Sequence, residues 1–136
     1  MEWVFDASIV LAWCFDDERT PQSDALFDKL ASKVPAVVPQ IWPLEISNVL
    51  LLASRKRRIS ETECRQFLGI LENAAISVDV LSIADIFSDV IHLADKHRLT
   101  CYDAAYLELC MRLSLPLATL DKDLRKAAAS AGVRLL

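Results

Sequence analysis

The chain has 136 residues, of which 54% are hydrophobic, and its 19 acids against 15 Lys and Arg give a net charge of −4. This length suits one domain, which at this size buries about two thirds of the surface of the unfolded chain. No apolar run approaches the ~20 residues that cross a bilayer. The start, Met-Glu-Trp-Val-Phe-Asp, is acidic where a secretory signal is basic, so we expect a cytoplasmic protein with no membrane segment.

Short β-branched or apolar runs alternate with longer helical patterns along the whole chain. Capping signals mark several helix starts: Thr20 precedes a proline, and Ser60 with Glu63 forms a capping box. In chain order we predict strand 3–5, helix 9–15, helix 21–31, strand 34–38, helix 41–55, a helix from residue 61, strand 76–80, helix 83–97, helix 101–113, strand 115–119, helix 123–130 and strand 133–135.

Strands separated by helices indicate a parallel sheet with helices on both faces, because a parallel crossover needs a dozen or more residues. We therefore predict a single domain over residues 1–136 with a three-layer α/β/α architecture. Ligands of such domains bind beyond the carboxyl ends of the strands, where the strand order reverses. A functional site is expected at that edge of the sheet.

Several classes of site are excluded by composition. Two glycines, Gly69 and Gly132, are too few for the Gly-rich loops that bind nucleotide phosphates. The four cysteines form no C-x-x-C pair, and His92 and His97 are five residues apart, so they do not share a helix face. We expect reduced, buried thiols and neither disulfides nor a zinc site.

Four acids fall at strand ends or helix starts of the predicted elements. Asp6 ends the first strand, and Asp121 follows the fourth, so both carboxylates project from the carboxyl ends of strands. Asp103 lies in the first turn of one helix and Glu45 near the start of another. Each acid alone has a structural explanation, because acids are favoured at helix N-termini and as N-caps. Asp6 and Asp121 meet if their two strands are neighbours, and the apolar setting of the acids is what indicates a site.

The neighbours of these acids are apolar, which points to a bound cation. The windows Val-Phe-Asp-Ala-Ser-Ile-Val, Trp-Pro-Leu-Glu-Ile-Ser and Cys-Tyr-Asp-Ala-Ala-Tyr contain no Lys or Arg. Partly buried carboxylates that repel one another are costly unless a cation or a proton offsets them. Oxygen ligands without Cys or His select Mg²⁺ or Mn²⁺ over zinc. Such sites support phosphodiester hydrolysis by activating water and stabilising the attacking and leaving oxygens.

The net negative charge does not exclude a nucleic-acid substrate. Four of the 19 acids are assigned to the metal site, and the other 15 balance the 15 Lys and Arg. The basic run 55–58 ends helix 41–55, where cations complement the helix dipole, or it contacts an RNA backbone. Trp13, Phe15 and Trp42 lie next to the site motifs, where they either pack in the core or in a groove for a protein partner, or stack on bases.

At these positions the sequence resembles the PIN-domain family, in particular the VapC-like toxins of toxin–antitoxin pairs. The resemblance covers the whole chain, with four motifs in order. They are Val4-Phe5-Asp6-Ala7-Ser8; Pro43-Leu44-Glu45 with Asn48; Tyr102-Asp103-Ala104-Ala105-Tyr106; and Ala118-Thr119-Leu120-Asp121-Lys122-Asp123-Leu124, which runs into an alanine-rich helix.

The resemblance implies a five-stranded parallel sheet, Mg²⁺- or Mn²⁺-dependent endoribonuclease activity, frequent homodimers and inhibition by a small antitoxin. It also implies roles for individual residues. Asp6, Glu45, Asp103 and Asp121 would be the catalytic and metal-binding acids. Candidates to orient these acids, the metal-bound water or the phosphate are Ser8, Asn48 and Thr119, and Asp123 either assists Asp121 or is only a charge at a helix N-terminus.

Other interpretations remain. A phosphate-transfer domain fits less well, because the first strand ends in Asp-Ala-Ser without the adjacent acidic pair or the D-x-D motif of such proteins. A DNA nuclease of related fold would need longer insertions to clamp a duplex. A catalytically weak RNA-binding or assembly module of the same fold is the stronger alternative. The stretch 49–53 is apolar around most of its helix, which favours a dimer interface there.

Overall fold

The computed structural model describes residues 2–136. Its strands are β1 (Val4–Phe5), β2 (Ala36–Pro39), β3 (Ile76–Asp79) and β4 (Leu117–Ala118). Its helices begin with α1 (Ala7–Cys14), the 3-10 turn η1 (Asp16–Glu18), α2 (Pro21–Ala31), α3 (Trp42–Arg55) and α4 (Glu61–Glu72). They continue with α5 (Ile83–Asp85), the π-helical turn η2 (Ile86–Val90), α6 (Ile91–His97), α7 (Cys101–Leu113) and α8 (Lys122–Ser130).

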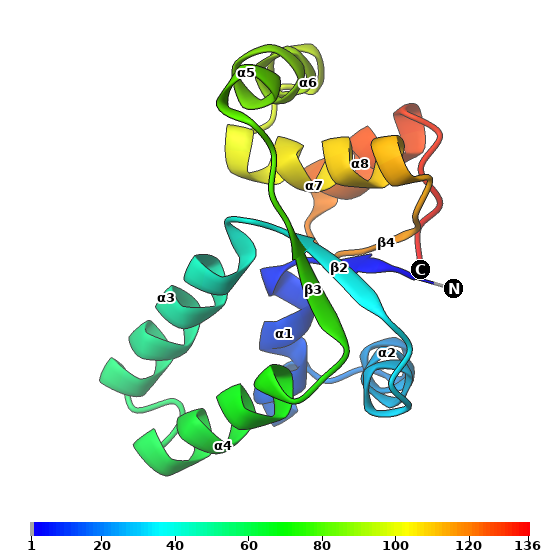
Figure 1. Cartoon of the computed structure of the whole chain (residues 1–136). Helices are drawn as coiled ribbons and strands as arrows, with labels where there is room; N and C mark the ends of the chain where they lie inside the picture. Colours follow the sequence, from blue (N-terminus) through cyan, green and yellow to red (C-terminus); the bar gives the residue numbers. More distant parts are fainter. Residues whose placement is uncertain (1) are drawn as a thin grey trace.

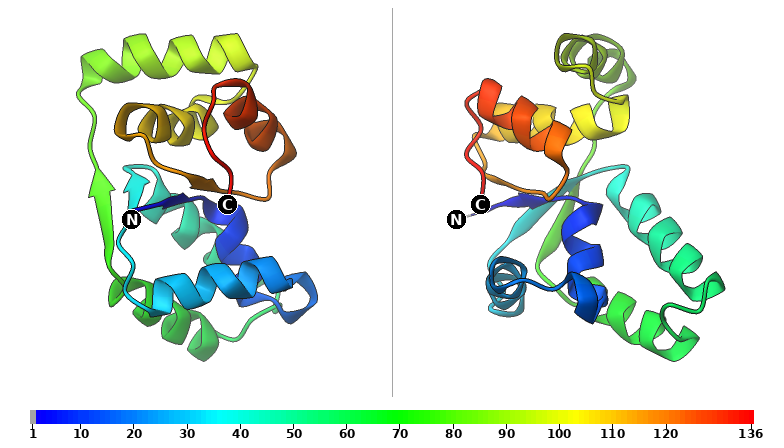
Figure 2. Two further views of the ribbon diagram at one scale, coloured as in Figure 1. Left: turned by 90° about the vertical axis from the view of Figure 1, so that its right-hand side faces the viewer. Right: turned by 180° about the vertical axis from the view of Figure 1, so that it is seen from behind.

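The strands lie between two groups of helices, as an α/β fold requires. Helices α1, α2, α3 and α4 are on one side of the strands, and α5, α6, α7 and α8 are on the other (Figure 1, Figure 2). β1 pairs with β4 and β2 pairs with β3, both in parallel. The two pairs are joined by a parallel bridge between Trp3 and Ala36. The predicted layers and the parallel pairing are therefore confirmed.

The fifth strand of the expected sheet is not found. The described residues form four strands in two two-stranded sheets, and predicted strand 133–135 contributes one bridge, from Leu135 to Leu117. Gly132 turns the chain with a φ of 78°, and the amide of Val133 donates to the carbonyl of Ala128 at 2.9 Å, which completes the end of α8. Pairing with β4 follows directly: Leu117 donates to the carbonyl of Arg134 at 2.8 Å and accepts from the amide of Leu136 at 2.9 Å. The end of α8 thus takes up the first residue of the predicted strand.

Side-chain caps explain where the helices begin. Ser60 and Glu63 form the predicted capping box, and Thr20 caps α2. Helix α1 begins at Ala7, two residues earlier than predicted, because the carboxylate of Asp6 accepts the amide hydrogen of Ser8 and caps it. The predicted helix 83–97 is α5, η2 and α6 in succession, interrupted by a π-helical turn.

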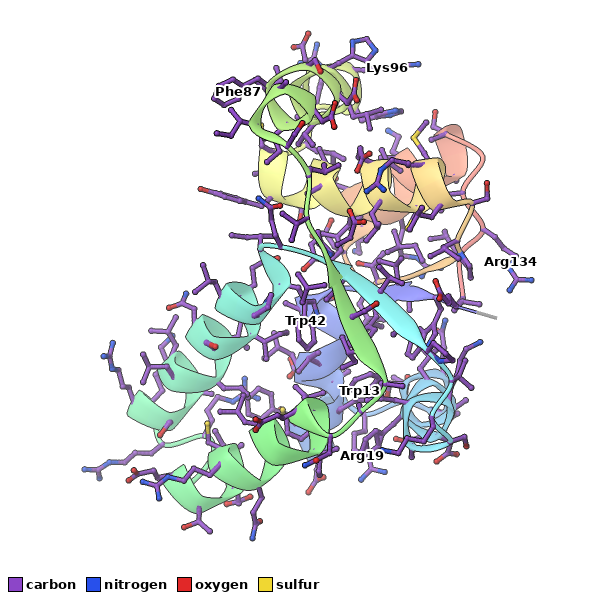
Figure 3. All side chains as sticks on the ribbon, in the orientation of Figure 1. Trp13, Arg19, Trp42, Phe87, Lys96 and Arg134 are labelled. Atoms are coloured by element: carbon purple, nitrogen blue, oxygen red, sulfur yellow. The ribbon has the colours of Figure 1, made fainter. Side chains whose placement is uncertain are left out.

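An aromatic cluster forms the centre of the core. The ring of Phe5 lies 4.9 Å from that of Trp3, and 5.4 Å from those of Trp13 and Trp42, between ring centroids. Trp13 and Trp42 lie in the interior, close to α1 and β3 (Figure 3). Phe15 is buried in a second, smaller cluster. All three candidate base-stacking residues are thus core residues, as the packing interpretation expected.

The basic run at the end of α3 is partly used by the fold. The guanidinium of Arg58 lies 3.9 Å from the centroid of the Phe15 ring and pairs with Asp17 at 3.4 Å. Arg57 has a φ of 59°, a left-handed conformation that ends the helix. The conformation of Arg57 agrees with a run that ends the helix, whereas Arg58 contacts the segment that follows α1. Over residues 2–136, no helix is both long and apolar enough to cross a membrane.

Candidate active site

The register of β1 and β4 brings Asp6 next to Thr119. Phe5 pairs with Ala118 in the parallel ladder, so the next residue of each strand lies at the same carboxyl edge. The hydroxyl of Thr119 donates to Oδ2 of Asp6, and the hydroxyl of Ser8 donates to Oδ1. This edge is where ligands of parallel α/β sheets bind. Two of the residues expected to orient the acids therefore hold Asp6.

Asp6 is a buried carboxylate, with 6% of its surface exposed. Burial raises the pKa of Asp6, and the hydrogen bonds from Ser8 and Thr119 partly oppose this by favouring the ionised form. Both hydroxyls also accept hydrogen bonds from backbone amides of the loop after β4. Ser8 accepts from the amide of Leu120 at 2.8 Å, and Thr119 accepts from that of Asp121 at 3.1 Å. The two hydroxyls thus connect the loop after β4 to Asp6.

Asp103 and Asp121 each occupy a helix start, and the charge of Asp121 acts on Asp103. Asp103 is in the first turn of α7, where Thr100 caps the helix by accepting its amide hydrogen at 3.1 Å. Asp121 is the N-cap of α8 and accepts the amide hydrogen of Leu124 at 2.8 Å. The pKa of Asp103 is raised, first by burial and then by the negative charges of Asp121, Asp6 and Asp123.

Glu45 reaches the same region from α3. The starts of α3 and α7 approach each other (Figure 1), and the hydroxyl of Tyr106 donates to Oε1 of Glu45 at 2.6 Å. The pKa of Glu45 is raised by burial and by the charges of Asp103 and Asp6. Sequence reasoning missed Tyr106 as a site residue. Its spacing, three residues after Asp103 on one helix face, is the signal that could have identified it.

The structure gives two of the expected site residues no visible role in orienting the acids. Asn48 is exposed on α3, and among residues 2–136 no hydrogen bond involves its side chain. Asp123 is exposed in the first turn of α8, and its charge adds to the field that raises the pKa of Asp103. Within the described part of the chain, no three His, Cys, Asp or Glu side chains converge closely enough to hold a metal ion.

The residues fit a divalent cation in their chemistry and their electrostatics. Four carboxylates supply hard oxygen ligands, which suit Mg²⁺ or Mn²⁺. Three of these acids, Asp6, Glu45 and Asp103, have pKa values raised by burial, and Asp103 and Glu45 also by neighbouring negative charge. A cation would offset this repulsion. The acids therefore share one electrostatic region, although their side chains do not converge on a single point.

The chain is similar in sequence to known proteins. Residues 3–130 match the model of the PIN domain. The chain is 31% identical to Ribonuclease VapC3 of Pyrobaculum aerophilum, over 91% of this chain and 92% of that protein.

Two solved structures have the same fold. The crystal structure of PAE2754 from Pyrobaculum aerophilum matches with a TM-score of 0.73 and 22% identity, over 99% of this chain and 83% of that one. A toxin–antitoxin complex from Klebsiella pneumoniae contains a chain that matches with a TM-score of 0.57 and 18% identity, over 89% and 88% of the two chains. From the family match and the ribonuclease relative together, we conclude that this chain belongs to the PIN-domain family, with a VapC-type ribonuclease among its relatives.

Proposed function

We propose that this protein is an endoribonuclease that hydrolyses RNA phosphodiester bonds with Mg²⁺ or Mn²⁺ held by Asp6, Glu45, Asp103 and Asp121. The observation that carries the proposal is the buried carboxylate of Asp6, held by Ser8 and Thr119 at the carboxyl edge of β1 and β4. Its charge also contributes to the raised pKa values of Glu45 and Asp103. The likeness to a ribonuclease supports RNA as the substrate. When bound, the cation would activate water and stabilise charge on the phosphate oxygens.

Within this mechanism, the chain's own residues have separate tasks. Ser8 and Thr119 fix the buried Asp6 carboxylate and favour its ionised form, because each donates a hydrogen bond to one of its oxygens. Asp103 and Asp121 come from the starts of α7 and α8, so their backbones are anchored by helix caps. Four negative charges repel RNA phosphates unless a cation is present, which makes substrate binding depend on the metal.

A chelation experiment tests the proposal. Purified protein should cleave single-stranded RNA in Mn²⁺ or Mg²⁺ and lose this activity in excess EDTA, because carboxylates alone do not generate the nucleophile at neutral pH. Activity should return when Mn²⁺ is added beyond the chelator, and Zn²⁺ should not restore it better than Mn²⁺. Preparations of Asp103→Asn, purified in parallel, control for contaminating nuclease. If the wild type cleaves RNA undiminished in EDTA while the Asp103→Asn preparation does not cleave it, the metal mechanism is excluded.

The alternative function is a catalytically weak RNA-binding or assembly module of the same fold. One observation favours it: among residues 2–136 the acids do not converge on a ready metal position. The same chelation experiment separates the two functions. Such a module would bind RNA without cleaving it under any of the metal conditions.

We further propose that the protein is a toxin inhibited by a small antitoxin. The support is its PIN-domain membership, its likeness to Ribonuclease VapC3, and its shared fold with a chain of a toxin–antitoxin complex. A short adjacent open reading frame that encodes a DNA-binding protein would be the expected genetic neighbour.

A homodimer is also part of the proposal. The most exposed apolar side chains are Val80 (75%), Ile83 (71%), Leu44 (68%) and Phe87 (68%). Leu44 lines an apolar cavity of about 310 Å³, and the other three lie within two residues in the chain of its lining residues Leu81 and Ile86. Phe87 projects outward from the fold (Figure 3). A protruding side chain and a cavity on one face allow two copies to pair around a twofold axis. Exposed apolar patches of this kind mark interaction surfaces.

Phe87→Glu should therefore convert a dimer to a monomer, because each interface would bury two unpaired carboxylates. Light scattering at micromolar concentration measures the mass. The variant to compare with it is Leu51→Glu on α3, because the sequence favoured a dimer interface over residues 49–53. Leu50 is fully buried there, whereas Leu51 is 46% exposed and distant in sequence from the Phe87 face. Dissociation by Leu51→Glu but not by Phe87→Glu would place the interface on α3, and a monomeric wild type would contradict the dimer itself.

A further inference from the structure

The carboxylate of Glu45 is held by a buried phenol from the far side of the sheet. The hydroxyl of Tyr106 lies 2.6 Å from Oε1 of Glu45, and these two residues are 61 positions apart in the chain. The Tyr106 side chain is 1% exposed and belongs to the main hydrophobic core. Among residues 2–136, no other side chain or amide donates to the Glu45 carboxylate, so Oε2 has no hydrogen-bond donor there.

The position of Tyr106 on α7 links it to a second acid of the site. Tyr106 follows Asp103 by three residues, and side chains at this spacing lie on one face of a helix, one turn apart. The same helix face therefore carries Asp103 and the hydroxyl that binds Glu45. Because the ring is packed in the core, its hydroxyl has a fixed position relative to Asp103.

We propose that Tyr106 is a positioning residue, which binds one oxygen of Glu45 and leaves the other for the divalent cation. This inference rests on the proposed metal-dependent function. A free glutamate side chain has several rotamers, and ordering it on metal binding costs entropy. The hydrogen bond from Tyr106 removes this cost before the metal arrives, as preorganised ligands do. A carboxylate acceptor makes it a charge-assisted hydrogen bond, which is stronger than a neutral one.

The test is Tyr106→Phe in the full chain, which removes the hydroxyl and keeps the buried ring. Mn²⁺ binding is measured by titration calorimetry without RNA. We expect about tenfold weaker Mn²⁺ affinity, since loss of an outer partner of a metal ligand typically costs 10–100-fold. The melting temperature in EDTA should change by only a few degrees. RNA cleavage by this variant should recover as Mn²⁺ is raised, which a purely structural defect would not allow.

The chain supplies a matched control. Tyr102 lies on the same helix, 62% exposed, and among residues 2–136 its hydroxyl makes no hydrogen bond. Tyr102→Phe should bind Mn²⁺ within about twofold of the wild type. Equal Mn²⁺ affinity of Tyr106→Phe and the wild type would overturn the positioning role. Failure of the wild type to bind Mn²⁺ at all would instead overturn the proposed metal site, so the two failures are distinguishable.

A double-mutant cycle shows whether Tyr106 acts through Glu45. Glu45→Gln removes the charge that binds the metal and should itself weaken Mn²⁺ binding. In that background, adding Tyr106→Phe should change the affinity by less than about twofold, because coupled residues are not additive. The same tenfold loss in both backgrounds would mean that Tyr106 acts independently of Glu45, against the proposal. The cycle compares folded proteins below their melting transitions, so a modest loss of stability does not obscure it.

Discussion

Replacing Asp103 with asparagine is expected to lower kcat/KM for RNA cleavage in Mn²⁺ by about 100-fold or more. The amide keeps the shape of the side chain but loses the negative charge that would hold the cation. Loss of a mere hydrogen-bonding partner of a metal ligand typically costs 10–100-fold, so loss of the ligand charge should cost at least as much. Cleavage rates over a range of Mn²⁺ concentrations measure the effect.

The same substitution should leave the metal-free protein equally stable or slightly more stable. The pKa of Asp103 is raised by burial and by nearby negative charges, so its ionised form costs stability in the folded state. This cost is present when the pH is above the raised pKa, and it disappears as the pH falls toward the unfolded value of 3.8. The stability difference between Asp103→Asn and wild type in EDTA should therefore shrink on acidification.

Asp85 is a matched control for Asp103. Both are the third residue after a capping hydroxyl, and each donates its amide hydrogen to that hydroxyl at 3.1 Å, from Ser82 and Thr100 respectively. Asp85→Asn should keep cleavage within about twofold and lose only the helix-dipole contact, about 0.3–1 kcal/mol. If Asp103→Asn behaves like Asp85→Asn, with retained cleavage and a lower melting temperature, Asp103 is a helix-terminus acid and not a metal ligand.

Thr119→Val is expected to lower the free energy of unfolding of the metal-free protein by about 1.5–3 kcal/mol, the usual contribution of a hydrogen bond to a charged group. Valine has nearly the same volume, so the core around this 1%-exposed side chain stays filled. The change removes the donor to Oδ2 of Asp6 and the acceptor of the Asp121 amide. Urea denaturation in EDTA measures the loss. Thr62→Val, at an exposed position on α4, should stay within ~0.5 kcal/mol.

The loss caused by Thr119→Val should depend on pH. Burial raises the pKa of Asp6 above 3.8, and the bond from Thr119 opposes that rise, so its removal raises the pKa further. Destabilisation should be largest where Asp6 is ionised, and it should decrease as the pH falls through the raised pKa and Asp6 takes up a proton. A loss that is constant from neutral pH down to about pH 4 would indicate a packing defect unrelated to the Asp6 charge.

The sequence by itself determined the order of the elements and the helix starts. Hydrophobic periodicity and caps are local properties, so the capping box at Ser60 and Glu63 and the helix after Thr100 were found where predicted. It also placed Asp6, Glu45, Asp103 and Asp121 at strand ends and helix starts. In a parallel α/β domain these positions share one edge, and the charge of Asp6 does contribute there to the raised pKa values of Glu45 and Asp103.

Only the tertiary structure decided which side chains meet at that edge. The register of β1 and β4 places Thr119 on Asp6, and the approach of α3 to α7 gives Glu45 its bond from Tyr106. Local patterns do not encode contacts between residues 61 or 113 positions apart, because register and packing depend on the whole core. The sequence likewise predicted a strand at 133–135, whereas Val133 still completes the end of α8 and the segment pairs with β4 through a bridge at Leu135.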